Sequence, residues 1–297
     1  METTKVRGLR DHRLWLEAFV LVNLAFLAPD IYVAHSTNLF QHAAEYIPFF
    51  FSLAAPLILL AALLAWKSQA TARLWCWLGN GVGWTSVIVG IVGLFFHLES
   101  RFFREETLES LVYAAPFAAP LAYTGIGLLL TMNRMVDART AEWAYWVLFL
   151  ALGGFVGNFV FSVTDHAQNG FFYLSEWIPV ASSAFAVGFL LAPFLVQVNR
   201  AYLGICTGVL LVQAAVGLLG FYYHTTANLH GPSPRAFDNF VYGAPAMAPL
   251  LFPNLVLLTL LGLWVLRDHL PASQKHELQS HAQSPVMVQP KLENHGV

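Results

Sequence analysis

The stretch EYIPFFFSLAAP, residues 45–56, starts with a carboxylate and ends on a proline inside a long apolar run. The same twelve-residue frame returns at 109–120, 176–187 and 238–249, with an acid in the first place each time. The first and third copies share EYIP and EWIP, whereas the second and fourth share VYAAPFAAP and VYGAPAMAP. This pattern predicts a helical hairpin that was duplicated twice, so that two similar halves share one orientation.

The composition indicates a membrane protein. Of the 297 residues, 57% are apolar and only 11% are charged, against about 25% charged residues in an ordinary soluble domain. Eight apolar runs are long enough to cross a hydrocarbon core, which takes about 20 helical residues. They are 14–34, 47–66, 75–96, 111–131, 143–163, 178–198, 202–223 and 240–264. The predicted fold class is therefore an all-α polytopic membrane protein of eight transmembrane helices, with hairpin repeats near 14–66, 75–131, 143–198 and 202–264.

The basic residues predict the orientation. With eight spans both termini share one side, and that side holds twelve of the fifteen lysines and arginines. Basic residues collect on the cytoplasmic side of a membrane, so both termini are expected in the cytoplasm and the chain in the plasma (inner) membrane. We expect a basic N-terminus at 1–13, the transmembrane domain at 14–266 and a disordered tail at 267–297, which is polar and lacks apolar periodicity.

Each predicted hairpin carries a histidine where its first helix ends and an acid where its second helix begins. Ten to fourteen residues separate the two, so each loop is expected to bring an imidazole close to a carboxylate on the extracytoplasmic side. The candidate ligand-binding residues are His35, His97, His166, His224, Glu45, Glu109, Glu176 and Asp238. Imidazole with carboxylate is a ligand set for a divalent metal ion, and the acid could also orient the ring from behind.

A second interpretation needs no ligand. Carboxylates favour helix N-termini and imidazoles favour C-termini, because of the helix dipole and the unpaired end groups. All eight residues could then be helix caps, and caps should point back along their own helices. The metal interpretation instead requires side chains from several hairpins to converge.

Several polar residues lie inside the predicted spans, where a charge is costly and usually functional. Asp30 follows a proline within an apolar run, and Asp165 is a further candidate. NLAFLAPD at 23–30 also matches NFVFSVTD at 158–165, which pairs the two aspartates and shifts the hairpin alignment by four residues. Only one of these two alignments of the first and third hairpins can be correct. Asn23, Asn158 and Gln213 are expected to form hydrogen bonds between helices.

These observations favour binding or transport of a divalent metal ion or small polar ligand, with the lipid bilayer as the surroundings. An alternative is a membrane enzyme that uses His and Glu as acid and base on a lipid, isoprenoid or quinone. A third possibility is a structural or assembly subunit. The sequence has no phosphate-binding loop and no nucleophile elbow, and its net charge of −2 gives no reason to expect nucleic acid.

Overall fold

A computed structural model of the chain describes residues 11–65 and 72–270. The predicted N-terminus and tail therefore lie largely outside the described residues. All regular structure in the described ranges is helical. The helices are α1 (His12–Ser36), η1 (Ala43–Glu45), α2 (Tyr46–Ala65), α3 (Ala72–Glu99), α4 (Phe102–Glu105), α5 (Leu108–Val112), α6 (Leu121–Met135), α7 (Ala141–Gln168), η2 (Leu174–Glu176), α8 (Trp177–Leu195), α9 (Arg200–Leu229), α10 (Ala236–Tyr242), η3 (Ala248–Leu250) and α11 (Leu251–His269).

Seven helical segments of the described chain are long and apolar enough to cross a membrane, which confirms a multi-pass architecture of helices. Six correspond to predicted spans that run unbroken, and the seventh is the segment Ala248–His269. Their surfaces carry many large apolar side chains, including Val22, Leu57 and Trp77, which are 62%, 68% and 72% exposed. Such an apolar exterior is stable in lipid and unstable in water.

The predicted fourth and eighth spans are not continuous helices. The fourth is split into α5 and α6, and α6 has only 15 residues, about 22 Å of helix. The eighth is split into α10 and α11, with a break after Tyr242. Both breaks fall in the segments AAPFAAP and GAPAMAP, whose prolines lack an N–H donor and disfavour helix in the residue before them. Pro116 and Pro245 therefore lie in the breaks, Pro120 is the N-cap of α6, and Pro249 lies in η3 directly before α11.

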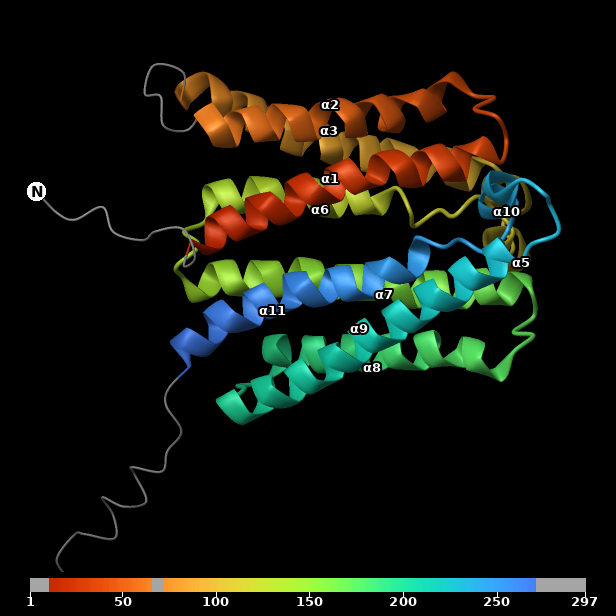
Figure 1. Cartoon of the computed structure of the whole chain (residues 1–297). Coiled ribbons are helices and arrows are strands. Elements are labelled where there is room, and N and C mark those ends of the chain that lie inside the picture. Colours follow the sequence, from red (N-terminus) through yellow and green to blue (C-terminus); the bar gives the residue numbers. More distant parts are fainter. Residues whose placement is uncertain (1–10, 66–71, 271–297) are drawn as a thin grey trace, which may run out of the picture.

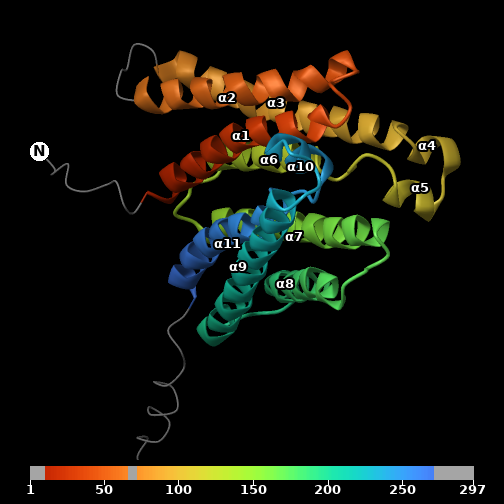
Figure 2. The same ribbon diagram turned by 45° about the vertical axis from the view of Figure 1, so that its right-hand side comes forward.

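The long helices form two four-helix bundles that lie side by side (Figure 1). The first bundle contains α1, α2, α3 and α6, and the second contains α7, α8, α9 and α11; in each, neighbouring helices pack in that cyclic order. As a result α1 lies diagonally across from α3, and α7 across from α9. Turned by 45°, the two bundles stay distinct (Figure 2).

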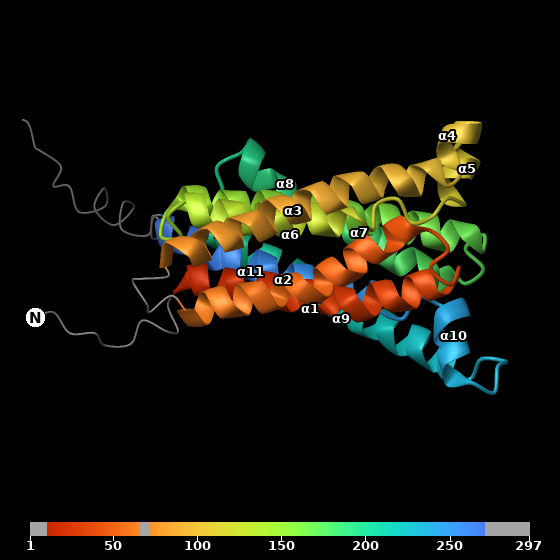
Figure 3. The same ribbon diagram turned by 90° about the horizontal axis from the view of Figure 1, so that it is seen from above.

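The two ends of the bundles differ. The short helices α4, α5 and α10 gather at one end (Figure 3), which also holds the last turns of α1, α3, α7 and α9 and is called the histidine end below. The opposite, terminal end holds the start of α1 and the end of α11, where the rings of His12 and Trp264 lie 4.8 Å apart. α6, together with the segment before it, carries the chain between the two ends as the other long helices do.

Glycines let the broken helices pack closely. A Cβ added at Gly90 of α3 would lie 2.7 Å from the Pro120 carbonyl oxygen, and one at Gly217 of α9 would lie 2.6 Å from the Pro249 carbonyl oxygen. Each glycine is seven residues before a histidine, His97 or His224. Small residues at such contacts allow two helix backbones in a membrane to approach each other. A glycine contact of this kind therefore positions each of the two broken segments.

Candidate functional site

The loops that leave α1 and α7 have the same conformation at matched positions. They are HSTNLFQHAAEYIP, residues 35–48, and HAQNGFFYLSEWIP, residues 166–179. In each loop the backbone N–H of the phenylalanine donates to the carbonyl of the histidine five residues earlier, at 3.2 and 2.9 Å. The same N–H also reaches the side-chain oxygen of the asparagine two residues earlier, at 3.2 Å for Asn38 and 3.1 Å for Asn169.

Both loops also use the left-handed backbone region at the same two places. Leu39 and Phe40 have φ of 59° and 52°, and Gly170 and Phe171 have φ of 70° and 53°. The conformation costs about 1–3 kcal/mol for a residue with a side chain. It turns each phenylalanine ring toward the histidine, with ring centroids 5.7 Å apart at His35 and 6.2 Å apart at His166.

Each of these loops places a glutamate behind its histidine. Glu45 Oε2 lies 3.5 Å from His35 Nδ1, and Glu176 Oε2 lies 3.8 Å from His166 Nδ1. The other carboxylate oxygen accepts a hydrogen bond from Asn38 at 2.8 Å or Asn169 at 3.2 Å. Both Oε2 atoms are buried without a hydrogen-bond partner, so each carboxylate is held in place and faces its imidazole.

The histidines of α3 and α9 are oriented by a backbone carbonyl instead. His97 Nδ1 lies 2.8 Å from the Pro116 oxygen, and His224 Nδ1 lies 3.0 Å from the Pro245 oxygen. A carbonyl oxygen only accepts, so Nδ1 carries the proton in both rings. The lone pair of the neutral ring is then on Nε2. The two prolines belong to the segments that break the predicted fourth and eighth spans.

The four imidazoles form two pairs. His35 and His97 have ring centroids 6.2 Å apart, and His166 and His224 have centroids 6.5 Å apart. These are called the first and second histidine pairs. Each pair joins diagonal helices of one bundle, at its histidine end. Within the described chain no three His, Cys, Asp or Glu side chains are close enough to hold one metal ion together. Each histidine pair therefore offers two imidazoles as direct ligands, and the glutamate lies behind one of the two rings.

The contacts of these side chains differ from those of helix caps. His230 and His269 donate from Nδ1 to carbonyls four residues earlier in their own helices, at 2.8 Å each. His97 and His224 instead donate to a carbonyl of a different segment. Glu176 occupies the N-cap position of α8 but its side chain makes no capping bond. The alternative of caps alone therefore does not account for these geometries.

The remaining acids of the hairpin frame lie apart from the imidazoles. Glu109 is exposed on α5, whose N-terminus is capped by Thr107. Asp238 pairs with Arg235 at 2.9 Å and accepts a hydrogen bond from Ser233. Thus the acids of the first and third copies contact a histidine, that of the fourth pairs within its own loop, and Glu109 of the second is exposed.

Asp30 and Asp165 are both half-buried near the histidine end. Neither forms an ion pair or hydrogen bond with another described residue. Asp30 lies five residues before His35, whereas Asp165 directly precedes His166. The loop geometry above aligns the two histidines, so the aspartates do not occupy equivalent positions.

The three amides predicted inside the spans have different surroundings. Asn23 and Asn254 exchange hydrogen bonds between α1 and α11, at 3.2 and 2.6 Å, and so join the two bundles. Gln213 donates to the Ser182 carbonyl of α8 at 2.7 Å, which confirms an interhelical bond. Asn158 is buried, and its Nδ2 has no hydrogen-bond partner within residues 11–65 and 72–270.

Sequence reasoning missed four groups of the site, namely the side chains of Asn38 and Asn169 and the carbonyls of Pro116 and Pro245. The signals were present. His-x-x-Asn occurs in copies one and three, and the first proline of YAAP and YGAP recurs in copies two and four. The carbonyls could not be found by looking for reactive side chains, because their contribution comes from the backbone.

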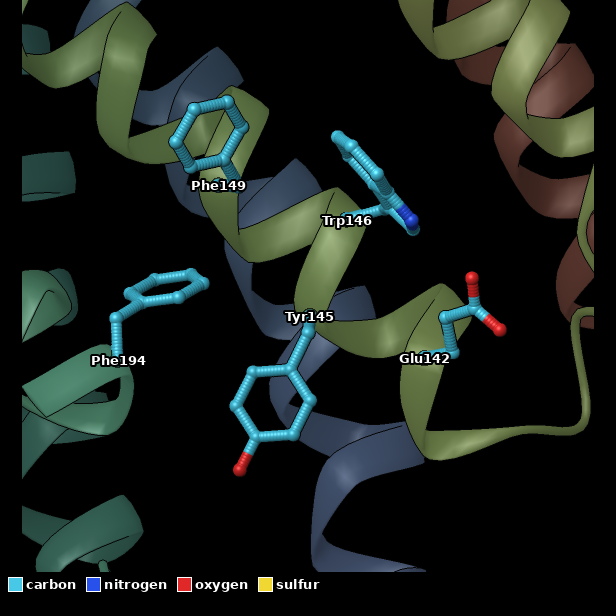
Figure 4. A pocket seen from close by; sticks show the side chains of 5 residues that line it. All are labelled: Glu142, Tyr145, Trp146, Phe149 and Phe194. Atoms are coloured by element: carbon cyan, nitrogen blue, oxygen red, sulfur yellow. The ribbon is translucent and has the colours of Figure 1, made fainter. Parts of the chain in front are cut away.

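Two hollows lie away from the histidine pairs. A groove of about 360 Å³ near the terminal end is lined by Glu142, Tyr145, Trp146, Phe149 and Phe194 (Figure 4). Its aromatic lining suits a lipid chain. A second hollow of about 490 Å³ lies at the loop between α9 and α10, where the side chains of Asn228 and Asn239 are occupied by hydrogen bonds that hold the loop.

Comparison of the chain with protein-family models, with curated proteins and with solved structures finds no significant match.

Proposed function

We propose that the chain is a plasma-membrane protein that binds a divalent transition-metal ion at each histidine pair from the extracytoplasmic side. The proposal includes eight crossings arranged as four hairpins, with both termini in the cytoplasm. The positive-inside distribution of basic residues supports this orientation. The matched loop geometry at 35–48 and 166–179 supports the duplication.

The observation that carries the proposal is that Nδ1 of every ring faces an oxygen atom of the protein. A histidine that binds a metal through Nε2 donates its other N–H to a carboxylate or a backbone carbonyl, which fixes the tautomer and raises ligand basicity. Here Nδ1 faces a carboxylate in His35 and His166 and a carbonyl in His97 and His224. Each pair therefore presents two Nε2 lone pairs.

The spacing of the rings fits one shared ion. With a nitrogen–metal distance of about 2.0–2.1 Å, two coordinated imidazoles have centroids roughly 5 to 6.5 Å apart, depending on the angle at the metal. The observed separations of 6.2 and 6.5 Å lie at the upper end of this range. Imidazole suits zinc, copper, iron and nickel, and a wide angle at the metal favours copper or nickel over tetrahedral zinc.

Binding is favoured over passage of the ion across the membrane. The terminal half of the first bundle is filled by Leu16, Val20 and Leu24, and that of the second by Leu148 and Ala151, all 0% exposed. An ion that leaves a histidine pair toward the terminal end would meet this apolar packing, and the energetic cost of desolvating a charge there is high.

The test is metal titration of the purified full-length chain after chelator treatment, with copper(II) and zinc(II) offered separately and bound metal measured by elemental analysis. We expect two ions per chain. His35→Ala with His97→Ala should leave one ion, His166→Ala with His224→Ala should leave one, and all four changes together should leave none.

A matched control is His42→Ala, because His42 is exposed on the same loop as His35 and, among the described residues, has no ring contact or ion pair with either histidine pair. This variant should keep both ions. Metal-free protein in every titration, or full metal content in the quadruple variant, would refute the proposal.

A further inference from the structure

The second bundle contains two buried amide atoms without partners. Asn158 Nδ2 and Gln213 Oε1 are both buried and make no hydrogen bond with any described residue, and their residues are 3% and 1% exposed. An unpaired buried polar group costs about 1–3 kcal/mol, and lipid offers it no water to recover that loss.

Both side chains face the interior of the second bundle. Asn158 shares the buried face of α7 with Phe155 and Ser162, and Gln213 shares that of α9 with Leu210 and Gly217. They lie eight residues before His166 and eleven before His224, which is about 12 and 16 Å along each helix. Gln213 thus lies nearly one helical turn deeper than Asn158 beneath the second histidine pair.

Further polar and apolar groups define the limits of this region. Ser162 lies one turn closer to the histidine end than Asn158, and its hydroxyl makes no hydrogen bond within the described chain. On the other side, Phe155, Ala186 and Leu210 are at most 1% exposed and belong to the apolar core. The region is therefore polar toward the histidine end and closed toward the terminal end.

The first bundle is different at the same depth. Ser162 and Asn158 lie four and eight residues before His166. The residues four and eight before His35 are Ile31 and Leu27. Ser86 lies eleven residues before His97, as Gln213 does before His224. Its hydroxyl donates to the Tyr123 carbonyl at 2.8 Å. The Tyr123 hydroxyl contacts Ser52 and the Pro48 carbonyl. Ser86, Tyr123 and Ser52 are thus paired within the protein, whereas Asp30, five residues before His35, has no hydrogen-bond or ion-pair partner among the described residues.

The chemistry of the unpaired atoms selects the ligand. Nδ2 offers a hydrogen and Oε1 offers a lone pair, so a group that pairs with Nδ2 must accept and a group that pairs with Oε1 must donate. A metal ion cannot accept from Nδ2, and an anion without a proton cannot donate to Oε1. Water meets both requirements, and buried polar groups of this kind are where internal water binds.

We infer that the second bundle holds internal water between the second histidine pair and Phe155. The inference goes beyond metal binding and does not depend on it. Its consequence is that the second histidine pair has water beneath it inside the membrane.

X-ray radiolysis of the full-length, metal-free protein tests the inference, since hydroxyl radicals formed from bound water oxidise the side chains beside it. We expect oxidation of Phe155 although it is 0% exposed. In the variant Asn158→Leu with Gln213→Leu the oxidation should fall several-fold, because the water loses its partners.

Trp143 is the control, because it is an equally buried aromatic residue of α7 at the terminal end, with its Nε1 bound to Asn133. It should stay unoxidised in both proteins. Phe155 that resists oxidation in the natural protein would overturn the inference even if the variant failed to fold. Unchanged oxidation in a folded variant would overturn it too.

Discussion

At the scale of single residues, the two glutamates behind the imidazoles have the clearest chemical role. Glu45 and Glu176 each have one oxygen fixed by an asparagine and the other turned to Nδ1 of a histidine. A carboxylate in this place keeps the proton on Nδ1 and strengthens Nε2 as a ligand. Glu109 starts the same twelve-residue frame but is in neither of the acid–histidine pairs that the described residues form, so it provides an internal comparison.

Glu45→Gln should weaken metal binding at the first histidine pair about 10- to 100-fold without abolishing it. The amide has nearly the same shape, but it removes the negative charge that supports the ring. The measurement is the dissociation constant by calorimetric titration of the variant that lacks the second histidine pair, so that one site is observed.

Glu109→Gln in the same background is the control and should leave the dissociation constant unchanged. Equal effects of the two substitutions would show that Glu45 acts through general surface charge instead of through His35.

At the scale of helices, close packing in the second bundle depends on Gly217. A Cβ at this position would lie 2.6 Å from the Pro249 oxygen and 2.7 Å from the Phe252 Cβ. The contact holds α9 against the start of α11, next to the segment whose Pro245 carbonyl orients His224. The glycine therefore links helix packing to the geometry of the second histidine pair.

Gly217→Ala should destabilise the protein by about 1–3 kcal/mol, because the added methyl group separates α9 from α11. Gly208→Ala on the same helix has open space around its Cβ and should be neutral or stabilising by up to about 1 kcal/mol. Thermal unfolding in detergent compares the two variants. A Gly217→Ala protein as stable as Gly208→Ala would mean that the helices tolerate a wider separation.

At the scale of the whole molecule, few polar contacts join the two bundles. Asn23 and Asn254 exchange two hydrogen bonds at the junction of α1 and α11. Nearer the terminal end, Trp143 Nε1 of α7 donates to Asn133 of α6 at 3.0 Å. In lipid there is no hydrophobic force to hold helices together, so such bonds and close packing decide how the bundles dock.

A double-mutant cycle of Asn23→Leu and Asn254→Leu should give a coupling energy of about 0.5–2 kcal/mol in unfolding experiments. Each single variant leaves the partner amide unpaired, whereas the double variant removes both groups. Pairing Asn23→Leu with Ser86→Ala, whose bond lies within the first bundle, should give no coupling. Additive effects for the two asparagines would show that the bundles dock without this pair.

The sequence predicted the helical membrane architecture because apolar length is a local property. Runs such as 14–34 and 143–163 appear in the structure as α1 and α7, extended by a few residues at each end. The fourth and eighth spans were predicted wrongly as continuous, since hydropathy does not register the missing N–H of a proline. The structure also distinguishes the two alignments, because 35–48 and 166–179 share loop geometry. By contrast, Asn23 bonds to Asn254, whereas Asn158 Nδ2 has no hydrogen-bond partner in the part of the chain that the structure describes.

By itself the sequence determined which residues are apolar enough for lipid and which imidazoles and acids recur at one end of the hairpins. Only the tertiary structure decided that these imidazoles pair across diagonals of two separate bundles, that two of the four acids face them, and that backbone carbonyls orient the other rings. The physical reason is that spacing along a chain sets the distance between neighbours on one helix or loop. Contacts across a bundle depend on how helices pack, and here glycines and prolines control that packing.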